Sequence, residues 1–117
     1  MPTYLCRLDE IVDGTARGFA VAGARRDTMF VVRRGDCVRG WLNACPHVDG
    51  APLAWRKDAY LSADGQAIVC YGHGAVFDMN TGVCTKGPCL GQSLTPVYVE
   101  RDVDGILWVS REPEPWR

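Results

Sequence analysis

The stretches "NACPHVDGAP", residues 43–52, and "VCYGHGAVFD", residues 69–78, contain both histidines of the 117-residue chain. One residue separates Cys45 from His47 in the first stretch, and two separate Cys70 from His73 in the second. Each pair follows an apolar run and is followed by glycine, which lets a backbone fold closely around a bound group and point amide N–H groups at it. We therefore expect each pair to lie on a loop that leaves a strand, and the two loops to enclose one inorganic centre.

The rest of the chain is typical of an all-β domain. Thirteen glycines and seven prolines separate short apolar runs. These runs predict strands over residues 4–8, 18–22, 28–33, 37–43, 66–70, 75–78, 94–101 and 106–110. Turns are expected at 33–36, 62–66, 78–82 and 101–105, each of which contains glycine and aspartate. The best helical candidate is a single turn at 8–12, and the chain length suits one domain.

Composition excludes several classes of partner. A net charge of −1 gives no reason to expect nucleic acid or an anionic membrane. No segment approaches the roughly eighteen apolar residues of a spanning helix. The first residues are acidic where a signal peptide would have its apolar core, which predicts a cytoplasmic protein with reduced thiols.

Six cysteines are many for a protein in that compartment, and metal binding explains at least some of them better than disulfides do. The paired pattern accounts for Cys45 and Cys70. We interpret Cys6 and Cys37 as small buried hydrophobic residues, and the role of Cys84 and Cys89 stays open.

The spacing of the pairs bears on the kind of metal. Two cysteines and two histidines could hold a tetrahedral zinc ion. Zinc spacings commonly pair cysteine with cysteine and histidine with histidine, whereas here each loop carries one of each. A 2Fe–2S centre with two cysteines on one iron and two histidines on the other fits this arrangement better.

Several motifs together make the chain similar to a known family. They are "CPH" at 45–47, "CYGHGAVFD" at 70–78, "TGVCTKGP" at 81–88, "LTPVYVE" at 94–100 and "GILWV" at 105–109. With them the chain resembles the Rieske ferredoxins and the Rieske-type domain family over nearly its whole length. The resemblance implies an all-β, Rieske-like fold of antiparallel sheets. It also implies a single domain over 1–117, in which a small cluster-binding subdomain, about 43–90, is inserted in a base.

The same resemblance implies one 2Fe–2S cluster with Cys45, His47, Cys70 and His73 as ligands, and a third loop whose Gly-Pro covers it. Many members have glycine two residues after the first histidine, where this chain has Asp49. Respiratory members carry an extra cysteine in each loop, joined as a disulfide. Glycine stands at both corresponding positions here, residues 50 and 72, so the chain groups with the bacterial low-potential type.

The sequence predicts an electron carrier and no enzyme. No histidine is left for the mononuclear iron of an oxygenase, and no glycine-rich nucleotide fingerprint is present. His47 and His73 are the expected exit for the electron. We expect a flavin-dependent reductase as donor and a terminal enzyme, such as an oxygenase or a reductase, as acceptor. Two alternatives stay open: a small accessory subunit like that of nitrite reductase, and an iron–sulfur redox sensor.

Overall fold

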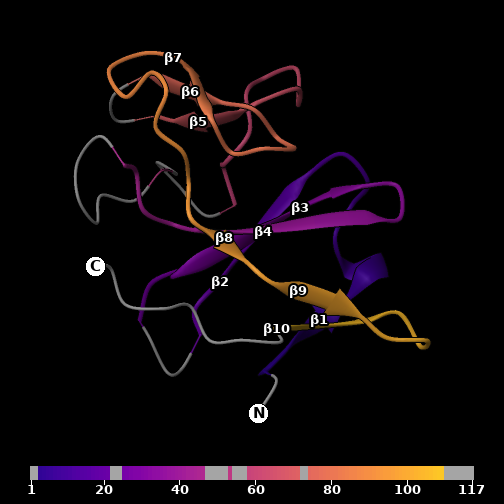
Figure 1. Cartoon of the computed structure of the whole chain (residues 1–117). Helices are drawn as coiled ribbons and strands as arrows, with labels where there is room; N and C mark the ends of the chain where they lie inside the picture. The colour runs from indigo at the N-terminus through magenta and orange to yellow at the C-terminus, as the bar shows by residue number, and fades with distance from the viewer. Residues whose placement is uncertain (1–2, 22–24, 47–52, 54–57, 72–73, 110–117) are drawn as a thin grey trace.

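The computed structural model describes residues 3–21, 25–46, 53, 58–71 and 74–109, and the other residues are drawn in grey in Figure 1. These ranges contain ten strands and one short 3-10 helix. The elements are β1 Thr3–Arg7, η1 Leu8–Glu10, β2 Ala16–Phe19, β3 Met29–Arg34, β4 Cys37–Leu42, β5 Ile68–Cys70, β6 Ala75–Phe77, β7 Cys84–Lys86, β8 Pro96–Val97, β9 Val99–Arg101 and β10 Ile106–Val109.

The strands form three antiparallel sheets, in the orders β1-β10-β9, β2-β3-β4-β8 and β5-β6-β7. β4 pairs directly with β8, with Gly40 opposite Val97, although the whole β5-β6-β7 sheet lies between them in the sequence. That sheet is therefore an insertion between two neighbouring strands of the base, and Figure 1 shows it at one end of the molecule. The predicted all-β fold with an inserted subdomain is confirmed.

The central sheet separates two hydrophobic cores. On β3, Phe30 and Val32 face the inserted sheet, and Met29 and Val31 face the outer β1-β10-β9 sheet. All four side chains are buried, which explains why this strand is a continuous apolar run and does not alternate with polar residues. Partners in the first core include Tyr60, Ile68, Phe77 and Leu94, and partners in the second include Leu5, Leu107 and Val109.

Several predicted elements agree with the structure, and three differ. The turn at 8–12 is η1, and the predicted turn at 33–36 joins β3 to β4. The strand predicted over 18–22 is wrong in position, since β2 spans Ala16–Phe19 and its register opposite β3 sets its limits. The strand predicted over 94–101 divides at Tyr98, because β8 pairs in the central sheet and β9 in the outer one. β7 was not predicted, because its second and third residues are exposed and the strand lacks apolar alternation.

Cys6 and Cys37 were both expected to be buried, and this prediction is confirmed for Cys6 and wrong for Cys37. Cys6 is buried in the second core with 1% of its surface exposed. Cys37 is exposed, because it begins β4 at the tip of the β3–β4 hairpin, opposite Arg34. Among the described residues, no helix is long and apolar enough to cross a membrane.

Candidate cluster site

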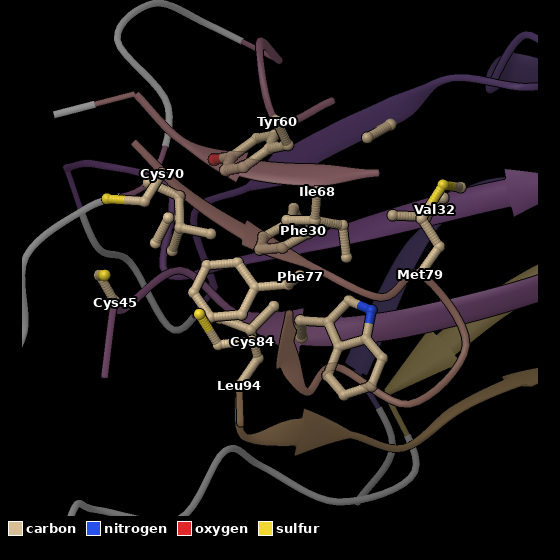
Figure 2. Packing of buried hydrophobic residues seen from close by; sticks show 14 of the residues in the cluster. Phe30, Val32, Cys45, Tyr60, Ile68, Cys70, Phe77, Met79, Cys84 and Leu94 are labelled. Atoms are coloured by element: carbon tan, nitrogen blue, oxygen red, sulfur yellow. The ribbon is translucent and has the colours of Figure 1, made fainter. Parts of the chain in front are cut away.

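The two cysteines of the paired motifs lie in one buried environment. Cys45 follows β4 and is 1% exposed, and Cys70 ends β5 and is 0% exposed. Both belong to the first core, and Figure 2 shows their sulfur atoms at the same edge of it. His47 and His73 lie outside the described residues. The structure thus brings together the cysteine half of the predicted ligand set.

Hydrogen bonds of Asn43 and Leu53 connect the first loop to its surroundings. The side chain of Asn43 donates from Nδ2 to the carbonyl oxygen of Asp27 at 3.0 Å, and its Oδ1 accepts from the backbone N–H of Leu53 at 2.9 Å. The carbonyl oxygen of Leu53 then accepts from the N–H of Tyr71, directly after Cys70, at 3.0 Å. Asn43 therefore closes the first loop, and Leu53 ties it to the second. Sequence reasoning missed both residues, and the only signal was an asparagine two residues before Cys45.

The second loop begins and ends on paired strands. Cys70 is opposite Ala75 in the β5–β6 hairpin, and the N–H of Gly74 donates to the carbonyl oxygen of Cys70 at 2.8 Å. Gly74 has a φ of +73°, a backbone conformation that favours glycine. The chain consequently reverses direction between Cys70 and Gly74, and the cysteine is held at the end of a strand.

The third loop packs on the backbone of the second. Gly87 has a φ of +106°, and a Cβ atom there would lie 2.8 Å from the Cα of Ala75 and 3.2 Å from the carbonyl oxygen of Gly74. Only a residue without a side chain permits this approach. The "TKGP" segment therefore lies directly over the end of the hairpin that carries Cys70.

Cys84 and Cys89 flank that segment, and both are 1% exposed. Burial raises the pKa of the Cys89 thiol to about 12, assisted by the neighbouring Cys84 and by the charge of Cys45. Cys84 and Cys89 belong to the same buried core as Cys45 and Cys70. Within the described ranges, however, no three side chains of cysteine, histidine, aspartate or glutamate are grouped as metal ligands. Cys84 and Cys89 thus do not complete a four-cysteine site with Cys45 and Cys70.

The donor set fits one half of a Rieske cluster. Two thiols at one edge of an apolar core could provide the cysteine ligands of one iron, which would leave the other iron to nitrogen donors. Ala75 and Phe77 are fully buried in the same core and have no side-chain hydrogen-bond donor.

Comparison with known proteins agrees with this geometry. A family model described as the Rieske [2Fe-2S] domain matches residues 1–102, and the chain belongs to this family. No curated protein matches the chain.

Three solved structures show the extent of the similarity. The ferredoxin of carbazole 1,9a-dioxygenase from Nocardioides aromaticivorans IC177 is 31% identical, with a TM-score of 0.71 over 95% of this chain and 99% of that chain. A chain in a complex of reduced oxygenase and oxidized ferredoxin of carbazole 1,9a-dioxygenase is 27% identical, with a TM-score of 0.72 over 98% and 97%. A ferredoxin from Sphingomonas yanoikuyae B1 shares the fold at 23% identity, with a TM-score of 0.72 over 95% and 99%.

Proposed function

We propose that this protein is a Rieske ferredoxin, a one-electron carrier that delivers electrons to a terminal oxygenase. The observation that carries this proposal is the end-to-end similarity to the ferredoxin of a carbazole dioxygenase, at 31% identity over 99% of that chain. That relative is a ferredoxin, an electron carrier, which supports a carrier and not an enzyme for this chain. The same observation favours a carrier over the accessory subunit and the sensor.

We propose that Cys45 and Cys70 hold one iron of the cluster and that His47 and His73 hold the other. The cluster accepts and releases a single electron, and histidine ligation makes it easier to reduce than an all-cysteine cluster. The described residues contribute a dry setting: both cysteines are buried, and no polar or charged residue of the described chain is buried. This setting keeps water from the thiolates, and the three loops hold them in place.

The acceptor is expected to dock over the loops. At the tip of the third loop Pro88 is exposed and Leu90 is 68% exposed, which offers an apolar contact beside the site. A flavin-dependent reductase is the proposed donor. A cytoplasmic location, the domain limits 1–117 and the subdomain limits of about 43–90 stay predictions from the sequence.

The proposal is tested by the cluster and by electron delivery. Protein purified without oxygen should carry two irons and two acid-labile sulfides per chain and give a Rieske-type paramagnetic spectrum when reduced. Cys45→Ser and Cys70→Ser should lose this spectrum, and Cys37→Ser, a change at an exposed cysteine outside the site, should keep it. Stoichiometric zinc without labile sulfide contradicts the cluster assignment. Failure to pass electrons from a flavin reductase to cytochrome c or to an oxygenase contradicts the carrier assignment.

A further inference from the structure

Cys84 and Cys89 are two buried thiols that the proposed cluster does not use. They belong to the same core as Cys45 and Cys70, and Cys84 begins β7 while Cys89 follows the Gly-Pro of the third loop. Four residues separate them in the sequence. Two buried thiols in the same core as the proposed ligands therefore have no role in the cluster site itself.

The backbone holds the two cysteines across a narrow loop. Gln92 bonds to both: its carbonyl oxygen accepts from the N–H of Cys84 at 2.7 Å, and its N–H donates to the carbonyl oxygen of Cys89 at 2.8 Å. The N–H of Gly91 also donates to the carbonyl oxygen of Cys84 at 3.1 Å. Both side chains are buried in the same core, and the Cys89 thiol is hydrogen-bonded to Cys84, so the two sulfur atoms are neighbours.

The closed loop also protects the pair from oxidation. A thiol reacts with a disulfide oxidant as the thiolate and only where the oxidant can reach it. Cys84 and Cys89 are both 1% exposed, and the Cys84 thiol donates to the carbonyl oxygen of Lys86 at 3.2 Å. Reaction therefore requires the third loop to move away from Gly74 and Ala75, where Gly87 now packs.

We propose that Cys84 and Cys89 are an oxidisable dithiol that stays reduced while the third loop is closed over the cluster and forms an intraloop disulfide when the cluster is lost. This inference rests on the proposed cluster site, because the cluster is what the three loops close around.

In the reaction both S–H bonds break and one S–S bond forms, so the pair gives up two protons and two electrons. Oxidised glutathione, a disulfide oxidant, accepts them: its own S–S bond breaks and two glutathione thiols leave. The disulfide also prevents Cys84 and Cys89 from pairing with the ligand cysteines. Cys45 and Cys70 consequently stay reduced and can take up a new cluster.

The test uses the cluster-loaded full chain incubated with oxidised glutathione, with and without an iron chelator. Cluster absorbance is followed, free thiols are alkylated at intervals, and disulfides are mapped by peptide mass spectrometry. We expect the Cys84–Cys89 disulfide to form at the rate of cluster loss, and at least tenfold faster with chelator than without it. Cys45 and Cys70 should still be recovered in alkylated form, as reduced thiols. The Cys84→Ala variant should still assemble a cluster. After cluster loss, its Cys89 should form a disulfide with Cys45 or with glutathione.

The matched control is Cys6→Ala, which removes a buried thiol from the other core and should leave the disulfide unchanged. Equal rates of disulfide formation with and without chelator overturn the protective role of the closed loop. A Cys45–Cys70 bridge, or no bridge at all after cluster loss, overturns the pairing. Absence of iron and labile sulfide from the starting protein contradicts instead the proposed function, and the disulfide map of that protein still tests the pair.

Discussion

Substitution of Gly87 by alanine tests whether the third loop is pressed against the second. Gly91, in the same loop, is its matched control. Both glycines have positive φ, +106° and +87°, so alanine is strained at either position. They differ in their surroundings: a Cβ at Gly87 would lie 2.8 Å from the Cα of Ala75, and a Cβ at Gly91 would have nothing within 4 Å.

The loss of stability in each variant has two contributions: the strain of a positive φ in alanine and the clash of the new Cβ atom with its surroundings. Backbone strain costs about 1–3 kcal/mol in both variants. In Gly87→Ala the new methyl group meets backbone, which cannot rotate away, so the loops must separate, at a further cost of about 1–3 kcal/mol. For a domain of this size that difference lowers the Tm by roughly 4–12 °C more in Gly87→Ala than in Gly91→Ala.

The assay compares thermal unfolding of the two variants by circular dichroism, together with the half-life of the cluster in a chelator. Gly87→Ala should lose its cluster faster than Gly91→Ala, because the displaced loop exposes the site. Equal Tm values and equal cluster half-lives for the two variants would refute the close packing of the third loop on Gly74 and Ala75.

Four other predictions concern potential, stability, pH and salt. Ala75 and Phe77 lack hydroxyl donors, so the wild-type potential should be about −150 to −100 mV, near the low end for Rieske centres. Ala75→Ser and Phe77→Tyr should each raise it by about 40 mV if each adds a bond of about 1 kcal/mol; a wild-type value above zero by protein-film voltammetry would contradict this. Asn43→Ala removes two hydrogen bonds and should lower the free energy of unfolding, measured in urea, by about 2 kcal/mol. An unchanged urea midpoint would show that other contacts close the first loop. Burial and the adjacent Asp27 raise the pKa of Tyr60 above its ordinary 10.0, so the unfolded chain loses the phenol proton first and the free energy of unfolding should fall as pH rises past about 10. In urea titrations over this pH range, Tyr60→Phe should show a smaller fall. An equal dependence on pH in the two proteins would exclude Tyr60 as its cause. With a net charge of −1, electron transfer to the oxygenase should depend mildly on ionic strength in stopped-flow measurements, and a steep decrease would reveal a charged docking patch.

The local features of this protein could be predicted because they depend on neighbours in the sequence. Two cysteine–histidine pairs at short spacing, each with glycine after it, indicate loops around a metal centre wherever those loops lie. The turn after Arg33 and the turn at 101–105 follow from glycine at the position that requires positive φ, as Gly35 and Gly105 show. The all-β class follows from short apolar runs between such turns.

The long-range features of the fold depend on which strands pair with each other, and no local sequence pattern specifies that pairing. The pairing of β4 with β8 across the inserted sheet, the limits of β2 and the division at Tyr98 depend on which strand lies opposite. Cys37 is exposed because it lies at the tip of the β3–β4 hairpin, although cysteine alone favours burial. The link from Asn43 through Leu53 to Tyr71 joins two loops whose ends meet only after the sheets have packed. Residue types therefore specified the chemistry of the site, and strand register and core packing specified how its loops are held.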